Sequence, residues 1–304
     1  MKNQQELIKQ ILSLKKEKNA IILTHFYQRF NLYKIADFIG DSLDLSRKAA
    51  NCDADIIVFC GVYFMAETAK ILSPQKKVFL PSMGSGCLMA DMIEPDDLIE
   101  LKNKYPDAAV VCYVNSTASI KALSDICCTS ANAIKILQSL PHKQIIFVPD
   151  KGLGAYAAQF VPDKEVILYD GFCPTHWRIT VEDIENTKQK YPGAVVLAHP
   201  ECDAPVIKAS DYVGSTSGMA DYAKDHPAQK FIVASDVGIL LYMKEKMPEK
   251  DFILPTREAV CPNMKKNSLL DVYNCLNDEI NEIHVDPQIA KEAVKSINRM
   301  LDVV

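Results

Sequence analysis

The chain has 304 residues, of which 48% are hydrophobic and 24% are charged, and its formal net charge at pH 7 is −5. These values are ordinary for a globular protein, and the length allows two or three domains. The negative charge argues against nucleic acid as the main partner. Because no apolar stretch approaches the roughly 18–20 residues that cross a bilayer, we expect no membrane-spanning segment. Residues 1–18 form an amphipathic pattern unlike a signal peptide, so we expect a cytoplasmic protein.

Strands alternate with helices along the chain, and the strands are continuous apolar runs, a pattern typical of buried parallel sheets. The first part is predicted to contain helix 4–17, strand 20–25, a helix over 43–50, strand 55–60, helix 64–72 and strand 77–80. The second contains helix 96–104, strand 108–114, helix 131–140, strand 144–148, helix 154–160 and strand 165–169. The third contains helix 181–190, strand 194–199, helix 217–225, strand 230–234, helix 238–247 and strand 251–254, and helices 267–280 and 287–301 follow it.

Three cysteines divide the chain at nearly equal intervals. Cys87, Cys173 and Cys261 are separated by 86 and 88 residues, and each lies in a loop after a short apolar run. The sequence around them repeats with the same period, because segments 16–28, 104–116 and 190–202 can be laid over one another. A unit of this length is too long for a common solenoid repeat, but it suits a small α/β domain used three times.

Polar residues coincide when the three segments are aligned. One position is shared by His25, Tyr113 and His199. Two residues later the chain has Tyr27, Asn115 and Glu201. Seventeen residues after the first set come Ser42, Ser130 and Thr216.

The repeat predicts an α/β fold of three homologous αβα domains with parallel sheets, in a pseudo-threefold arrangement around a central active site. We expect the domains to cover residues 1–87, 88–173 and 174–261, with the C-terminal helices of 262–304 packing back on the first domain. Equivalent residues then lie around one axis. Three cysteine thiolates and a ring of polar side chains are therefore expected to share one central site.

The chain has ten cysteines, which is high for a cytosolic protein. Without a secretory signal, a disulfide framework is not expected. Cys60 and Cys112 lie in apolar strand patterns and Cys275 on a helix, so we interpret them as small buried side chains. The three loop cysteines could hold a zinc ion with one open position, a 4Fe–4S cluster with one open iron, or no metal at all.

The three aligned hydroxyl residues, Ser42, Ser130 and Thr216, each precede or open a predicted helix. Taken singly, each is best explained as part of a helix cap. If all three helix starts face one axis, their free N–H groups converge and favour an anion. A ligand with two carboxylates, or with a carboxylate and a phosphate, would suit such a site.

The first aligned set is predicted at the C-terminal ends of strands, where open parallel sheets bind their ligands. A single histidine at such a position is often structural, but two at equivalent positions, His25 and His199, favour a functional role. The second set offers groups for acid–base chemistry and hydrogen bonding. His176 lies three residues after Cys173 and could reach the same cavity, although the other repeats have no counterpart.

The chain resembles the quinolinate synthase family over essentially its whole length. The resemblance lies in residues 25–27 (HFY), 113–115 (YVN), 199–202 (HPEC) and 261–265 (CPNMK), and in all three loop cysteines. It implies three homologous αβα domains and a 4Fe–4S cluster on three cysteines, with the fourth iron free for substrate. It also implies a transferase of NAD biosynthesis that joins iminosuccinate (iminoaspartate) to dihydroxyacetone phosphate, losing phosphate and two waters, to form quinolinate. The imine would be handed over by an aspartate-oxidising enzyme.

Carried over by position, the resemblance implies roles for individual residues. The expected cluster ligands are Cys87, Cys173 and Cys261, and the open iron could act as a Lewis acid. The expected proton-transfer groups are Tyr27, Glu201 and His176. The residues expected to line the substrate site are His25, Ser42, Tyr113, Asn115, Ser130, His199, Glu201 and Thr216. Some family members carry a CxxCxxC run at the last ligand that can form a disulfide; this loop has only Cys261, so no such redox switch is expected.

Two other functions fit part of the sequence. An iron–sulfur sensor or scaffold protein without turnover would explain the cysteines, but it does not need three polar sets in register. A zinc hydrolase could use the same three thiolates, but three anionic sulfurs would make the zinc a poor Lewis acid.

Overall fold

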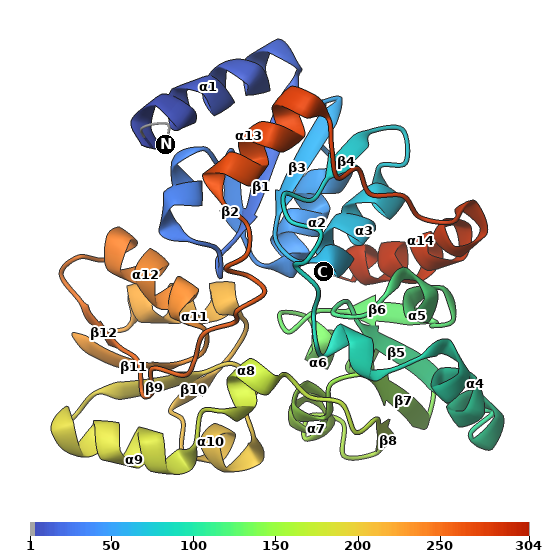
Figure 1. Ribbon diagram of the computed structural model, residues 1–304. Coiled ribbons are helices and arrows are strands. Elements are labelled where there is room, and N and C mark those ends of the chain that lie inside the picture. The colour runs from blue at the N-terminus through green and yellow to red at the C-terminus, as the bar shows by residue number, and fades with distance from the viewer. Residues whose placement is uncertain (1–3, 304) are drawn as a thin grey trace.

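Three four-stranded parallel sheets form the framework of the protein. The structure is a computed structural model that describes residues 4–303. The strand orders of the sheets are β2-β1-β3-β4, β6-β5-β7-β8 and β10-β9-β11-β12, so each sheet has the same topology. Figure 1 shows three lobes around a common centre, with the first in blue, the second in green and the third in yellow to orange. The predicted α/β fold with three αβα units is confirmed.

Each sheet takes its four strands from one continuous part of the chain. The first sheet contains β1 (Ala20–His25), β2 (Phe38–Gly40), β3 (Ile56–Cys60) and β4 (Lys77–Phe79). The second contains β5 (Ala109–Tyr113), β6 (Ile126–Cys128), β7 (Gln144–Val148) and β8 (Glu165–Leu168). The third contains β9 (Val195–Ala198), β10 (Tyr212–Val213), β11 (Lys230–Ala234) and β12 (Asp251–Ile253).

The helices that accompany the sheets also follow the repeat. The first unit has α1 (Gln4–Glu17), α2 (Ser42–Ala50) and α3 (Tyr63–Leu72), with a 3₁₀ turn η1 (Phe30–Lys34). The second has η2 (Ala90–Met92), α4 (Pro95–Lys104), α5 (Ala118–Ala122), α6 (Ala133–Ser139) and α7 (Lys151–Ala158). The third has α8 (Pro174–Trp177), α9 (Val181–Lys190), α10 (Ala204–Lys208), α11 (Thr216–Asp225) and α12 (Val237–Lys246), and α13 (Leu269–Asp278) and α14 (Pro287–Asp302) end the chain.

The sequence predicts three strands per unit, but each sheet has a fourth. The missed strands are β2, β6 and β10, which are only two or three residues long and lie at the edge of each sheet. Such short segments carry no apolar run that could be recognised. Helix α7 also differs from the predicted 154–160, because Asp150 caps the helix by accepting the Leu153 N–H at 2.6 Å and starts it at Lys151.

An aspartate at equivalent positions joins each short strand to its neighbour. Asp37, Asp125 and Asp211 each accept a hydrogen bond from the backbone N–H of the residue fifteen positions earlier, at 2.8 Å in all three units. The repeat is therefore visible in single hydrogen bonds as well as in topology.

A lysine at equivalent positions closes a helix in each unit. Lys76, Lys164 and Lys250 donate to backbone carbonyls just after α2, α6 and α11, where the last carbonyl groups of a helix lack intrahelical partners. A cation at this end also complements the helix dipole.

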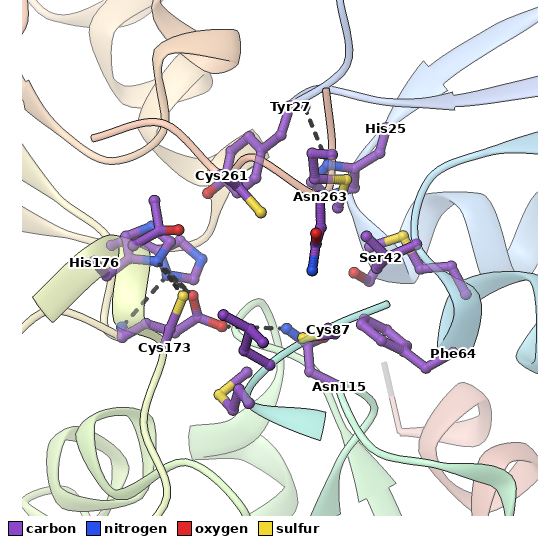
Figure 2. A pocket seen from close by; sticks show the side chains of 18 of the residues that line it. His25, Tyr27, Ser42, Phe64, Cys87, Asn115, Cys173, His176, Cys261 and Asn263 are labelled. Atoms are coloured by element: carbon purple, nitrogen blue, oxygen red, sulfur yellow. Dashed lines mark hydrogen bonds and ion pairs between the residues drawn. The ribbon is translucent and has the colours of Figure 1, made fainter. Parts of the chain in front are cut away.

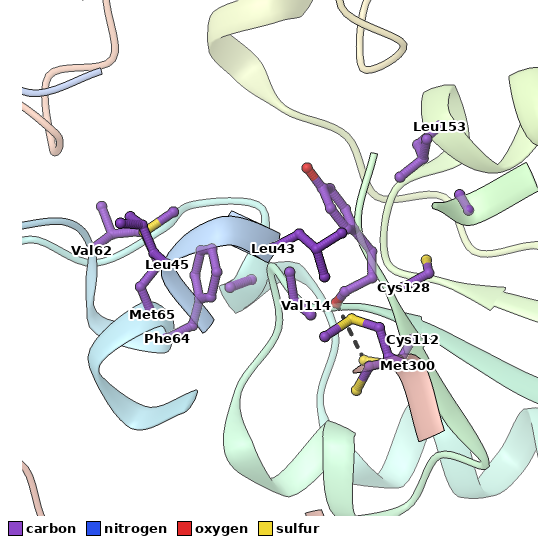
Figure 3. Packing of buried hydrophobic residues seen from close by; sticks show 14 of the residues in the cluster. Leu43, Leu45, Val62, Phe64, Met65, Cys112, Val114, Cys128, Leu153 and Met300 are labelled. Atoms are coloured by element: carbon purple, nitrogen blue, oxygen red, sulfur yellow. Dashed lines mark hydrogen bonds between the residues drawn. The ribbon is translucent and has the colours of Figure 1, made fainter. Parts of the chain in front are cut away.

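The hydrophobic core continues from one unit to the next. One cluster of buried residues includes Leu43 and Phe64 of the first unit, Val114 of the second and Leu197 of the third. Figure 3 shows Leu43 and Phe64 beside Val114 at the junction of the first two units. Because the units share a core, their relative positions are fixed by packing, and a cavity between them has defined walls.

The two C-terminal helices do not share one position. α13 packs on α1 and β3, as expected for a segment that returns to the first unit. α14 packs mainly against α5 and β6 of the second unit and also reaches α3, which corrects the expectation that all of 262–304 lies on the first unit (Figure 1). Its Ser296 hydroxyl donates to the Lys121 carbonyl, and Arg299 donates to the Asp125 carbonyl, so polar contacts add to the apolar ones. Within residues 4–303, no helix is both long enough and apolar enough to cross a membrane.

Candidate active site between the three units

A cavity of about 900 Å³, including its mouth, lies where the three units meet. Its walls come from loops and strand ends of all three units (Figure 2). The thirteen residues singled out in the sequence all line it: His25, Tyr27, Ser42, Cys87, Tyr113, Asn115, Ser130, Cys173, His176, His199, Glu201, Thr216 and Cys261. The structure thus brings the predicted residues together, while their roles stay predictions.

The three loop cysteines are partly exposed in this cavity and form no disulfide. Burial raises the pKa of the Cys87 thiol to about 12, and it raises the pKa values of Cys173 and Cys261 as well. The backbone N–H of the residue three positions later hydrogen-bonds to each sulfur and acts in the opposite direction. These donors belong to Ala90, His176 and Met264, so the repeat extends to the hydrogen bonds of the sulfurs.

His25 and His199 keep equivalent positions and the same tautomer. In each, Nδ1 accepts the backbone N–H of the residue two positions on, at 3.1 Å from Tyr27 and 3.4 Å from Glu201. The proton of the neutral ring is therefore on Nε2. The Nε2 of His199 lies 3.2 Å from the Ser130 hydroxyl. Burial lowers the pKa of both rings to about 3, so both are neutral at physiological pH.

Glu201 is the buried anion of the cavity, with only 3% of its surface exposed. Its Oε2 lies 2.7 Å from His176 Nδ1, its Oε1 accepts the Asn115 amide at 3.3 Å, and Tyr113 donates its hydroxyl to the same carboxylate. Burial alone would raise the pKa of Glu201, but His176 and the hydrogen bond from Tyr113 outweigh it and hold the pKa below its ordinary value. The cavity thus contains a carboxylate that is ionised at neutral pH.

Tyr27 is a buried side chain of the cavity that, unlike Glu201, is neutral. Its hydroxyl lies 3.1 Å from Thr216 Oγ1 and 2.8 Å from Ser235 Oγ. Burial, and then the charge of Glu201, raise the pKa of Tyr27 well above 10. Tyr27 therefore keeps its proton at neutral pH and can act as a hydrogen-bond donor or acceptor.

The three hydroxyl residues are placed less symmetrically than predicted. Ser42 and Thr216 are the first residues of α2 and α11, and Asp41 and Ser215 cap these helices. Ser130 does not open a helix, because α6 begins at Ala133 rather than at the predicted residue 131. The expected convergence of three helix N-termini is therefore incomplete, although the three hydroxyl residues do line one cavity.

Three further polar residues at the site were not predicted from the sequence. Arg178 adds a cation to the wall, and Asn263 places its amide in the cavity between the cysteine-bearing loops (Figure 2). Ser235 contacts the site from behind its wall. Asn263 lies in the Cys261 loop and could have been suspected, whereas Arg178 and Ser235 carry no local signal.

A second group of possible metal ligands overlaps the three cysteines. One ligand atom each from Cys173, His176 and Glu201 lies within 4.8 Å of the other two. His176 Nδ1 is 3.2 Å from the Cys173 sulfur and closer still to Glu201. This set has the thiol, imidazole and carboxylate donors that zinc accepts, so it keeps the zinc alternative open.

The fold and the cavity define an α/β protein of three repeats with a thiol-lined polar site at its centre. The family model described as Quinolinate synthetase A protein matches residues 9–302. The chain is 50% identical to the quinolinate synthase of Alkaliphilus metalliredigens (strain QYMF), over 99% of both chains. It is 51% identical to that of Clostridium acetobutylicum and 47% identical to that of Caldicellulosiruptor saccharolyticus, in each case over 98% of both chains. The chain therefore belongs to the quinolinate synthase family of enzymes.

Proposed function

We propose that this enzyme joins iminosuccinate to dihydroxyacetone phosphate to form quinolinate, releasing phosphate and two waters, and that it uses a 4Fe–4S cluster with one open iron. The observation that carries the proposal is that three sulfurs from equivalent loops line the same cavity as the aligned polar residues. Membership of the family supports the reaction, and the product is a precursor for NAD biosynthesis.

The three cysteines fit such a cluster. Each sulfur comes from a loop rather than from a CxxC pair, and each receives a backbone N–H, which is a common feature around cluster sulfurs. Within residues 4–303, Cys87, Cys173 and Cys261 are the cysteines that line the cavity, which leaves one iron without a protein thiolate. When bound, the cluster would supply a Lewis acid for a substrate hydroxyl or carboxylate.

The walls suit anionic substrates. Iminosuccinate carries two carboxylates and dihydroxyacetone phosphate carries a phosphate. Ser42, Ser130 and Thr216 can donate hydroxyl hydrogen bonds to these groups, and Arg178 contributes a positive charge. The neutral Nε2–H groups of His25 and His199 add donors without adding charge.

We assign proton transfer to Glu201, which has lost its proton, and to Tyr27, which has kept it. Ring formation moves protons between carbon and nitrogen and removes hydroxyl groups as water. Glu201, which is ionised, can accept a proton, and Tyr27, which is neutral, can hold or donate one. His176 contacts Glu201 directly and completes this set.

The substrate also indicates what must precede this reaction. An imine of this kind hydrolyses in water, so it has to be made close to the time of use. An enzyme that oxidises aspartate would supply it, and the two enzymes are expected to work in the same compartment, the cytoplasm.

The test is turnover by protein purified without oxygen. Iminosuccinate formed from oxaloacetate and ammonia is mixed with dihydroxyacetone phosphate, and quinolinate and phosphate are measured together. We expect the wild type to form quinolinate and phosphate in equal amounts. Cys52→Ala, whose thiol lies outside the cavity, should do the same, and Cys261→Ala should form neither product. A wild-type protein that holds iron and sulfide but makes no quinolinate would favour the sensor or scaffold function instead.

A further inference from the structure

Ser235 connects two cavity residues from outside the cavity. It follows β11 directly, and its side chain is fully buried. Its Oγ lies 2.8 Å from the Tyr27 hydroxyl and 3.1 Å from His176 Nε2. Ser235 does not belong to the described residues that line the cavity, so it has no direct access to a substrate there.

These contacts belong to a longer hydrogen-bonded chain that joins the first and third units. His176 Nδ1 lies 2.7 Å from Glu201 Oε2, and the Tyr27 hydroxyl lies 3.1 Å from Thr216 Oγ1. The chain therefore runs from Glu201 through His176, Ser235 and Tyr27 to Thr216.

Ser235 is the member that links the two ends of the chain. On one side, His176 Nδ1 donates to the Glu201 carboxylate, and the other ring nitrogen, Nε2, faces the Ser235 hydroxyl. On the other side, the same hydroxyl bonds to Tyr27. A serine hydroxyl has one donor and two acceptor lone pairs, so it can serve both neighbours at once. One buried group therefore holds both the Tyr27 hydroxyl and the His176 ring.

The repeat shows that this serine is not part of the shared architecture. The positions equivalent to Ser235 in the first and second units are Gly61 and Pro149, and neither has a side-chain hydrogen-bonding group. Both of those units nevertheless form the same sheet. A hydroxyl is present only in the unit where Tyr27 and His176 meet it, as expected for a residue that serves the site rather than the fold.

We propose that Ser235 is a positioning residue for the reaction: it holds the Tyr27 hydroxyl and the His176 ring in place by joining them in one hydrogen-bonded chain with Glu201. The kinetic part of this inference rests on the proposed function. Without the Ser235 hydroxyl, Tyr27 keeps Thr216 at 3.1 Å but loses its closer partner at 2.8 Å, and His176 Nε2 loses its bond to the serine. Both groups would then be held less firmly.

The first test compares Ser235→Ala with Ser73→Ala. Ser73 is also fully buried, and its hydroxyl donates to the Ala49 carbonyl at 2.9 Å, so its removal costs a similar buried hydrogen bond without touching the site. At equal iron content, we expect kcat of Ser235→Ala to fall tenfold to a hundredfold with KM changed by less than twofold, and Ser235→Cys to recover part of it. Ser73→Ala should keep the wild-type kcat. Wild-type kcat in Ser235→Ala would overturn the proposal.

The second test does not depend on turnover. In full-length protein labelled with ¹⁵N-histidine, the Nε2 signal of His176 reports on its contact with Ser235. Ser235→Ala should shift this signal, and Ser73→Ala should leave it unchanged. No shift in Ser235→Ala would overturn the proposal. If the wild type made no quinolinate, the proposed function would fail, while these signals would still decide whether the hydrogen-bonded chain exists.

Discussion

The carboxylate of Asp236 accepts the backbone N–H of Cys261 at 2.6 Å and so ties a cysteine-bearing loop to the start of α12. Asp236 is fully buried, and its other oxygen accepts from Lys265 Nζ at 2.8 Å and from the Gly238 N–H at 2.7 Å. Lys265 also donates to the Tyr27 carbonyl of the first unit. One buried carboxylate therefore fixes the Cys261 loop and the start of α12 relative to each other. Through Lys265 it also fixes them relative to the segment that follows β1 in the first unit.

Replacing Asp236 by asparagine should loosen this whole junction. The substitution leaves the Lys265 ammonium without its partner and removes a charged acceptor from two backbone N–H groups. Breaking a buried ion pair costs about 3–5 kcal/mol, so the free energy of unfolding in urea should fall by that amount. Asp170→Asn, which breaks an exposed pair with Lys151, should leave the unfolding curve where it was. An equal loss in both variants would show that the Asp236 contacts do not stabilise the junction.

Glu201→Gln and Tyr27→Phe should separate catalysis from cluster binding. Glutamine cannot take up a proton at neutral pH, and phenylalanine has no hydroxyl, yet both keep the shape of the side chain. We expect kcat to fall by at least about a hundredfold in each, with iron content unchanged. Tyr156→Phe is the matched control, because its hydroxyl bonds to the Val213 carbonyl away from the candidate active site. Full turnover in either site variant would show that its assigned role is wrong.

Acid should destabilise the folded chain through His25 and His199. Burial lowers the pKa of both to about 3, while the unfolded chain protonates its histidines near 6.5. Between these values the unfolded state binds more protons, so stability is lost as the pH falls from about 6.5 toward 3. Each histidine contributes at most about 1.4 kcal/mol per pH unit.

Urea unfolding of the metal-free protein at pH 7, 6 and 5 measures this slope without interference from acid-labile sulfide. His25→Gln should lower the slope by about one proton, and replacement of the exposed His142 by glutamine should not change it. A stability that is flat over this range would mean that the two rings are protonated as readily in the folded protein as in the unfolded one.

The fold was predictable because equivalent residues of the three units recur at regular intervals in the sequence. The intervals between the cysteines and the aligned polar sets fix three equivalent units, and apolar runs locate nine of the strands. β2, β6 and β10 were not predictable, because two or three residues give no periodicity and their pairing depends on the neighbouring strand. The place of α14 was missed because an amphipathic pattern shows that a helix packs, not what it packs against.

The composition of the cavity was predictable for a similar reason. Strand ends and equivalent loops of symmetric units must face a common centre, so His25, His199 and the three loop cysteines could be placed together. Contacts between residues at non-equivalent positions could not be predicted, since they depend on how the units are oriented relative to one another. The bonds of Ser235 to Tyr27 and His176 are of this kind.

The most direct measurement is the iron and acid-labile sulfide content of protein purified without oxygen, for the wild type, Cys87→Ala and Cys52→Ala. Cys87 lines the cavity, whereas Cys52 lies outside it, two residues after the end of α2. The proposed cluster predicts about four iron and four sulfide per chain in the wild type and in Cys52→Ala, and their loss in Cys87→Ala. Wild-type protein with zinc in place of iron, or with iron that Cys87→Ala retains, would contradict a cluster on the three loop cysteines.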